Sequence, residues 1–212
     1  MAVTIQAETI KLGVSRVFHR KLYDPSRTSN IVLLHGWSFT SLDWTKLDLF
    51  GTLSSLGYNV FAPDYPGFGE SHGDERYQIT QGNIENGPLF VNDYMRAVNI
   101  QKAVVMGASM GGGIAVRYTL LHQSNVSALI GVAPAWVEDI KGKFDEIQVP
   151  TLFVWGGSDR SVPVSMAKEY SSLIKDSKLE IIRGAGHAVY LDRPEEFLKA
   201  VKNFLSGLAK NH

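Results

Sequence analysis

Short runs of almost uninterrupted apolar residues recur along the chain from residue 31 onward. Such runs are typical of strands buried on both faces of a sheet, because neither side of the strand then needs polar residues. They lie at 31–34, 60–62, 103–106, 128–132, 151–155 and 179–182. Nearer the amino end, residues 3–5 and 14–18 alternate between polar and apolar side chains, which predicts an exposed, antiparallel pair of strands.

Between these runs, apolar residues recur at three- and four-residue intervals, which is the spacing of an amphipathic helix. We expect Gly57 to end the first of these helices. Asp192 is expected to cap the last one, with Pro194 in its first turn. The predicted helices cover about 42–56, 90–98, 114–121, 166–174 and 195–208.

The alternation of buried strands with helices predicts the α/β class. We expect a mostly parallel, twisted sheet of about eight strands, with an antiparallel amino-terminal edge and helices on both faces. No linker, repeat or low-complexity segment interrupts the pattern, so residues 1–212 are expected to form a single domain. In sheets of this kind, ligands bind at the carboxyl ends of the strands. We therefore expect the catalytic or binding residues among those that follow each apolar run.

Charge and composition narrow the possible partners. The chain has 21 basic and 21 acidic residues and no basic cluster, which argues against nucleic acid as a partner. No apolar stretch approaches the ~20 residues that span a bilayer, and residues 1–11 do not resemble a secretory signal, so we expect no membrane contact and a cytoplasmic location. The lack of cysteine excludes disulfides, thiolate metal sites and a cysteine nucleophile. No cluster of metal ligands stands out either, so no metal or other cofactor is expected, and the oligomeric state is left open.

The run at 103–106 ends in the pentapeptide Gly107-Ala108-Ser109-Met110-Gly111, and a stretch compatible with a helix follows it. This strand, Gly-x-Ser-x-Gly and helix order is the form of a nucleophile elbow, a tight turn that raises one serine hydroxyl above the end of a strand. Gly107 and Gly111 occupy the two positions where a side chain would collide with the folded backbone. The pattern makes Ser109 the candidate nucleophile.

A serine hydroxyl needs a neighbouring base, and histidine is the base best matched to neutral pH. His187 follows the run at 179–182, and Asp159 follows the run at 151–155, so both are expected at the same edge of the sheet as Ser109. The resulting order along the chain is serine, aspartate, histidine. That order is typical of α/β-hydrolases and differs from the orders in the chymotrypsin and subtilisin folds.

Three other residues compete for these roles. His35 also follows an apolar run and is the main rival base, but its position favours bracing the loop that contains it. Asp64 precedes the nucleophile and has turn-forming neighbours, so we expect it to bond within its own loop. Asp139 lies several residues beyond its strand and is the weaker rival acid.

A tetrahedral oxyanion requires two donors that are already in place. We expect one to be the backbone N–H of Met110, which follows the nucleophile and opens the next helix. The other is expected in the loop after the run at 31–34, most simply the backbone N–H of Trp37.

Together, these features resemble the successive signatures of the α/β-hydrolase superfamily. The resemblance implies Ser109 as nucleophile, His187 as base and Asp159 as acid, with the amides of Trp37 and Met110 as oxyanion donors. Reasoning from the residues indicates the same five positions. The segments that carry the resemblance occur in the family's order at 33–36, 64–71, 107–112, 154–159 and 184–187.

The chain departs from many members of that superfamily in one respect. Only residues 133–150 separate the fourth and fifth apolar runs, which is too short for the helical cap that many members insert there. The chain is therefore similar to the small, capless branch. Without a cap, the site is expected to be open to solvent and bordered by aromatic side chains. Phe39, Trp136 and Tyr190 are the candidate pocket residues.

The sequence therefore predicts a carboxylesterase-like serine hydrolase that cleaves small acyl esters through an acyl-enzyme on Ser109. Two alternatives stay open. The same residues could hydrolyse thioesters or amides, form peracids or cleave carbon–carbon bonds, because fold and triad do not fix the substrate. Alternatively, the domain could be a binding or scaffold protein that does not use its triad.

Overall fold

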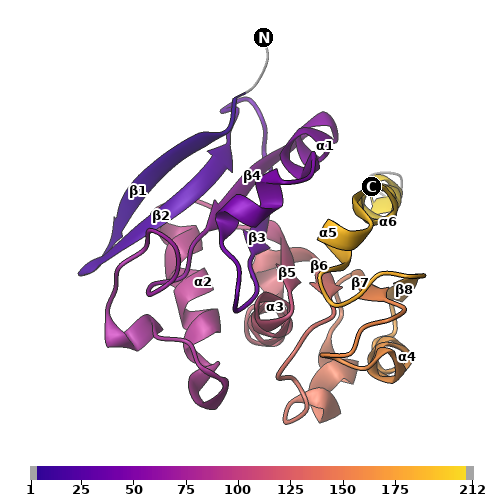
Figure 1. Cartoon of the computed structure of the whole chain (residues 1–212). Helices are drawn as coiled ribbons and strands as arrows, with labels where there is room; N and C mark the ends of the chain where they lie inside the picture. Colours follow the sequence, from indigo (N-terminus) through magenta and orange to yellow (C-terminus); the bar gives the residue numbers. More distant parts are fainter. Residues whose placement is uncertain (1–3, 209–212) are drawn as a thin grey trace.

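The computed structural model describes residues 4–208, which form a layered α/β molecule around one eight-stranded sheet (Figure 1). The order of the strands across the sheet is β1-β2-β4-β3-β5-β6-β7-β8. β1 and β2 pair antiparallel, β2 also runs antiparallel to β4, and every other pair is parallel. The strands are β1 (Gln6–Leu12), β2 (Ser15–Leu22), β3 (Ser29–Leu34), β4 (Tyr58–Pro63), β5 (Ala103–Ala108), β6 (Val126–Val132), β7 (Thr151–Gly156) and β8 (Ser177–Ile182).

Helices cover both faces of the sheet (Figure 1). α2, α3 and α4 pack on one face, and α1, α5 and α6 pack on the other, so each face has its own apolar core. The predicted fold class is confirmed. The helices are α1 (Leu49–Ser55), α2 (Asn86–Ala97), α3 (Met110–Leu121), α4 (Val164–Leu173), α5 (Val189–Asp192) and α6 (Pro194–Leu208). Short 3-10 turns lie at η1 (Ser41–Thr45), η2 (Glu75–Tyr77), η3 (Gln81–Asn83), η4 (Gln123–Asn125) and η5 (Lys141–Glu146).

Burial on both faces explains why the central strands read as continuous apolar runs. All six residues of β5 are buried, and so are all six of β7. Along β5, Val105 packs into the core under α2 and α3, whereas Val104 and Met106 pack into the core under α1 and α6. β8 lies at the edge of the sheet, and its burial is correspondingly mixed.

Three local expectations differ from the structure. The predicted helix at 42–56 is divided into η1 and α1, and Leu42 is exposed. A capping box between Thr40 and Asp43 starts a tight turn that buries Trp44, and the α-helix begins only at Leu49. Asp192 does not cap α6. It is the last residue of α5, and its Oδ2 accepts a hydrogen bond of 2.7 Å from the backbone of Gly186.

The first strand is also displaced from the predicted residues 3–5 and begins at Gln6. Val3 lies outside the described residues, and Ile5 precedes the strand. β1 is largely exposed, so it has no strong apolar pattern from which its position could be read. Its pairing with β2 begins at the turn around Gly13, whose φ of +62° is readily adopted by glycine.

The connection from β6 to β7 is short. Among residues 133–150 the only regular element is η5, so no cap domain covers the carboxyl edge of the sheet between these strands. In the part of the chain that the structure describes, no helix is long and apolar enough to cross a membrane.

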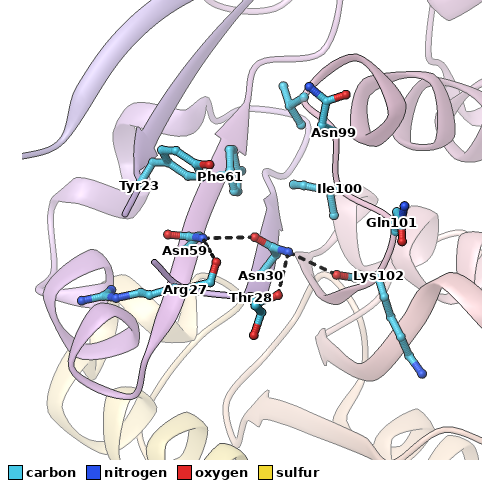
Figure 2. A pocket seen from close by; sticks show the side chains of 11 residues that line it. Tyr23, Arg27, Thr28, Asn30, Asn59, Phe61, Asn99, Ile100, Gln101 and Lys102 are labelled. Carbon is cyan, nitrogen blue, oxygen red and sulfur yellow. Dashed lines mark hydrogen bonds between the residues drawn. The ribbon is translucent and has the colours of Figure 1, made fainter. Parts of the chain in front are cut away.

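A hollow of about 410 Å³ opens at the amino ends of β3 and β4 (Figure 2). Its amide side chains largely bond to neighbouring groups. Asn59 donates to Asn30 Oδ1 at 3.4 Å, and Asn30 donates to the carbonyl oxygen of Lys102 at 3.5 Å. Because Ser109 follows the carboxyl end of β5, this hollow lies at the opposite edge of the sheet from the candidate nucleophile.

Candidate active site

Ser109 occupies the turn between β5 and α3 with backbone angles that a residue other than glycine rarely adopts. Its φ is +54° and its ψ is −119°. Such strain persists only where the surroundings enforce it. Here the Ser109 N–H donates to Val132 at 2.8 Å, and the Ser109 carbonyl accepts from Ala135 at 3.0 Å and from Gly113 at 2.9 Å. These bonds fix the turn on both sides of the residue.

The two glycines of the pentapeptide allow this turn to close. A Cβ at Gly107 would lie 2.0 Å from the carbonyl oxygen of Gly111. A Cβ at Gly111 would lie 2.2 Å from the carbonyl oxygen of Leu34, at the end of β3. Both neighbours are backbone atoms, which cannot rotate away as a side chain can. The elbow geometry therefore requires glycine at both positions.

The structure brings Ser109, His187 and Asp159 into one hydrogen-bonded chain. His187 Nε2 lies 2.8 Å from Ser109 Oγ, and His187 Nδ1 lies 2.8 Å from Asp159 Oδ2. An ionised carboxylate can only accept, so Nδ1 carries the proton and Nε2 is left to accept from the serine hydroxyl. The Asp159 side chain is fully buried, whereas a quarter of the His187 side chain is exposed.

Asp159 is further fixed by its own loop. Its Oδ1 accepts backbone hydrogen bonds from Ser161 at 2.8 Å and Val162 at 3.0 Å. One carboxylate oxygen thus binds the loop after β7, and the other is directed at His187. The buried carboxylate therefore has hydrogen-bond donors on both oxygens, which is how a buried charge is tolerated.

The loops after β7 and β8, which carry Asp159 and His187, pack directly against each other. A Cβ at Gly156 would lie 2.0 Å from the carbonyl oxygen of Gly186, so the backbones meet only because position 156 is glycine. Ser158 donates to the carbonyl of Ala185 at 2.9 Å, which ties the two loops together. The Asp192 bond to Gly186 holds the residue next to His187 from the other side.

The rival residues are occupied elsewhere. His35 is buried, its Nδ1 donates to the Gly36 carbonyl at 2.8 Å, and its Nε2 accepts from the Tyr65 N–H at 3.2 Å. It braces the loops after β3 and β4, as predicted. Asp64 accepts from the backbone of Glu70 in its own loop at 3.4 Å, as predicted, but its shorter bond, 2.6 Å from the backbone of Ser41, joins it to the segment after β3. Asp139, the weaker rival acid, forms an ion pair with a buried arginine instead of approaching His187.

The burial of His35 leads to a prediction about acid stability. Burial lowers the pKa of His35 in the folded protein, so it stays neutral where the unfolded chain takes up a proton. The unfolded state then binds more protons below the ordinary pKa of about 6.5. The free energy of unfolding should therefore fall with decreasing pH below that point, by up to about 1.4 kcal/mol per unit for this group.

The matched variant is His35→Gln, whose amide oxygen can still accept from Tyr65 but cannot be protonated. Urea unfolding at pH 5 and pH 7.5 should show a shallower loss of stability in the variant than in the wild type. His19 also has a pKa lowered by burial, and it contributes equally to both proteins. Equal slopes in the two proteins would contradict the prediction.

The two predicted oxyanion donors border the serine. Met110 is the first residue of α3, where a backbone N–H has no partner within the helix. Trp37 lies in the loop after β3, next to Gly36, where a Cβ would lie 3.4 Å from Ser109 Cβ. Within residues 4–208, neither the Trp37 nor the Met110 N–H donates to a protein acceptor. Neither N–H is therefore taken by a protein acceptor, although Met110 as a residue is wholly buried, and the role of the two amides as an oxyanion hole stays a prediction.

Aromatic side chains gather beside this loop, though not all of those predicted. Trp37 is 47% exposed, and its ring centroid lies 5.8 Å from that of Trp136 and 5.4 Å from that of Phe68. Phe68 had no predicted role at the site, although it follows a strand, as the other site residues do. Phe39 is partly buried, 6.0 Å from the Tyr190 ring.

The prediction of Tyr190 as a pocket residue needs correction. Tyr190 is only 2% exposed, and its ring packs 4.7 Å from Trp44 and 6.0 Å from Phe197. It belongs to the core between α5, α6 and the sheet. A side chain enclosed in this way cannot line an open site.

Comparison with known proteins places this arrangement in a family. A family model described as the alpha/beta hydrolase fold matches residues 30–143 and 135–194, which together include every candidate residue named above. The chain belongs to the alpha/beta hydrolase fold family. Its short connection between β6 and β7 makes it a small member with no cap domain in the described residues.

Three relatives indicate which alpha/beta hydrolases this one resembles. A crystal structure of a predicted CIB-like hydrolase from Thermoplasma acidophilum is 48% identical, with a TM-score of 0.93, and the match covers 95% of this chain and 98% of that one. Protein ABHD14A of Danio rerio is 31% identical over 84% of this chain and 64% of its own length, so the chain spans somewhat less than two thirds of that relative. The human "Putative protein-lysine deacylase ABHD14B" is 28% identical over 98% of this chain and 100% of its own length.

Proposed function

We propose that this alpha/beta hydrolase is a serine hydrolase that cleaves small carboxylic esters through an acyl-enzyme on Ser109. One observation carries the proposal: the unbroken hydrogen-bonded chain from Asp159 through His187 to Ser109. A buried carboxylate, a histidine with its Nε2 directed at a hydroxyl, and a serine on a strained turn together supply an activated nucleophile.

In the proposed first half-reaction, Ser109 Oγ attacks the ester carbonyl while its proton passes to His187 Nε2. The C–O π electrons move onto the carbonyl oxygen, and the N–H groups of Met110 and Trp37 stabilise that oxyanion. Asp159 stays ionised and stabilises the imidazolium. His187 then protonates the leaving alkoxide as the C–O bond breaks, which leaves the acyl group on Ser109.

Water completes the cycle in the second half-reaction, in which it is the nucleophile and Ser109 is the leaving group. His187 takes a proton from the water, whose oxygen attacks the acyl carbonyl, and the proton then passes to Ser109 Oγ as the acid departs. Each proton that leaves an oxygen is held at Nε2 and returned. The chain therefore needs no group beyond those named for the chemistry.

The open surroundings support small esters as substrates. Ser109 is partly accessible, Trp37 is nearly half exposed, and within residues 4–208 no cap covers this edge of the sheet. An open site gives few contacts to the far end of a long acyl chain, so short or compact acyl groups should be turned over at least as well as long chains. Specificity then depends on the aromatic side chains beside Trp37.

A second candidate substrate class is the amide of an acylated lysine side chain. The observation that favours it is the match to the human protein called a putative protein-lysine deacylase, which spans the whole of that relative and nearly all of this chain. Amide cleavage would use the same residues, but His187 must then protonate an amine as it leaves. An ester places less demand on that step because alkoxides leave more easily.

The test of the proposed function is a fluorophosphonate probe followed by peptide mass spectrometry, together with a panel of p-nitrophenyl esters of increasing acyl length and an acetyl-lysine peptide. We expect labelling on Ser109, rapid turnover of the short esters and slower turnover of the peptide. Faster turnover of the peptide than of any ester would favour the second candidate. Labelling at another residue, or no turnover of any substrate, would favour a binding role and contradict the proposal.

A further inference from the structure

The feature outside the proposed triad that stands out is a buried arginine on α3. Arg117 is only 3% exposed and pairs with two largely exposed carboxylates from different segments of the chain. Its Nη1 donates to Glu85, just before α2, and its Nη2 lies 2.5 Å from Asp139, in the connection from β6 to β7. A buried charge of this kind is costly even when paired, and Arg117 Nε has no hydrogen-bond partner within the described residues, so the placement of this arginine needs an explanation.

A third bond of Arg117 goes to the backbone beside the candidate site. Arg117 Nη2 also donates to the carbonyl oxygen of Trp136 at 2.8 Å. Trp136 has a φ of +60°, in the left-handed region that costs a residue other than glycine of order 1–2 kcal/mol. The arginine therefore binds the carbonyl of a strained residue, in the same loop as Asp139.

The Trp136 loop is fixed to the nucleophile elbow on its other side. Ala135 donates to the Ser109 carbonyl at 3.0 Å, and a Cβ at Gly113 would lie 2.0 Å from the Ala135 carbonyl oxygen. Between these anchors the Trp136 ring rests 5.8 Å from the Trp37 ring, at an interplanar angle of 65°. Trp37 in turn carries the N–H proposed to stabilise the oxyanion.

We propose that Arg117 is a positioning residue that holds Trp136 against Trp37 and thereby forms the apolar wall that receives the substrate. This inference rests on the proposed function for its kinetic consequence, but the position of Trp136 can be measured without it. The wall takes the place of contacts that a cap domain would otherwise supply. The substrate class it fits is an ester of a small aromatic acid, with the ring of the acyl group lying along the two indoles.

The kinetic test compares Arg117→Met, Trp136→Ala and the double variant. The matched control is Arg96→Met, because Arg96 is an exposed arginine on α2. Loss of an interaction that an enzyme makes equally with substrate and transition state raises KM and leaves kcat unchanged. We expect Arg117→Met to raise KM for a p-nitrophenyl ester of an aromatic acid by at least tenfold. KM for p-nitrophenyl acetate should change much less, as should kcat for both esters. Arg117→Lys, which keeps the positive charge, should raise KM for the aromatic ester less than Arg117→Met does.

The double variant separates positioning from general stabilisation. If Arg117 acts through Trp136, adding Arg117→Met to Trp136→Ala should cause no further rise in KM, because the wall is already missing. The proposal would be overturned if Arg117→Met raised KM equally for both esters. A further rise in KM when Arg117→Met is added to Trp136→Ala would also overturn it. Should Arg117→Met fail to fold, Arg117→Lys provides the comparison, because a single ammonium group cannot reproduce the bonds of Nη1 to Glu85 and of Nη2 to Asp139 and the Trp136 carbonyl together, so KM for the aromatic ester should still rise.

Near-UV circular dichroism tests the position of Trp136 without catalysis. The difference spectrum between wild type and Trp136→Phe reports the ordered Trp37–Trp136 pair. Arg117→Met should lose the same contribution while its far-UV spectrum is retained. An unchanged near-UV spectrum in Arg117→Met would overturn the positioning role even if the protein is a hydrolase. If Arg117→Met loses the near-UV contribution of the Trp37–Trp136 pair but the wild type hydrolyses no ester, the positioning role stands and only the proposed function is contradicted.

Discussion

Replacing Ser109 with alanine should lower kcat for a p-nitrophenyl ester by about 10⁶-fold, the loss typical when the nucleophile of a working triad is removed. The substitution leaves no atom that can form the acyl-enzyme, although the proposed oxyanion donors at Met110 and Trp37 are unchanged. The residue keeps its Cβ, so the strain of the φ at +54° is unchanged and folding should be normal. The measurement is initial rate against ester concentration, corrected for spontaneous hydrolysis.

Ser127→Ala is the matched control, because Ser127 is an exposed serine on β6, away from the carboxyl edge. It should retain the wild-type rate, and unfolding curves of both variants should overlay that of the wild type. A Ser109→Ala protein that is folded and still hydrolyses the ester at more than a small fraction of the wild-type rate would contradict the role of Ser109.

The central part of the fold could be predicted because a strand that is buried on both faces appears in the sequence as a continuous run of apolar residues. β5 and β7 read as apolar runs since every one of their residues is buried. β1 has no such run. It pairs with one neighbour only and is mostly exposed, so its position follows from the register with β2 rather than from its own residues.

The candidate triad was also accessible from the sequence, because three strand ends in a parallel sheet must lie along one edge. Other features depend on contacts between distant segments, which local patterns do not report. Tyr190 follows the same kind of loop as His187, yet the turn of α5 directs its ring into the core against Trp44. Arg117 reads as an ordinary helical arginine, and only the packing of α3 against the 133–140 connection shows that it is buried.

The candidate nucleophile and two residues of the connection from β6 to β7 have strained backbones. Ser109, Ala133 and Trp136 each have a positive φ, and Ala135, the neighbour of Trp136, donates to the Ser109 carbonyl. Strain of this kind is maintained only by surrounding bonds. The short connection from β6 to β7 therefore helps to hold the elbow in shape as well as forming the border of the proposed site.

Asp159→Asn should lower kcat by about 10⁴-fold with little effect on folding, because the amide forces the wrong tautomer on His187. In the wild type, Asp159 Oδ1 accepts from the Ser161 and Val162 amides, and Oδ2 faces His187 Nδ1. In the variant, the two backbone donors keep the amide oxygen on their side. The NH₂ group must then face Nδ1, which accepts its hydrogen, so the imidazole proton moves to Nε2.

A histidine protonated at Nε2 cannot accept the proton of Ser109, so the nucleophile is no longer activated although every heavy atom stays in place. Asp145→Asn provides the same chemical change at an exposed position and should retain full activity. The decisive measurement is kcat together with the rate of fluorophosphonate labelling, and both should fall in Asp159→Asn. A variant with near wild-type kcat would show that His187 does not depend on this carboxylate. Asp159 would then have a structural role only, in holding the loop after β7.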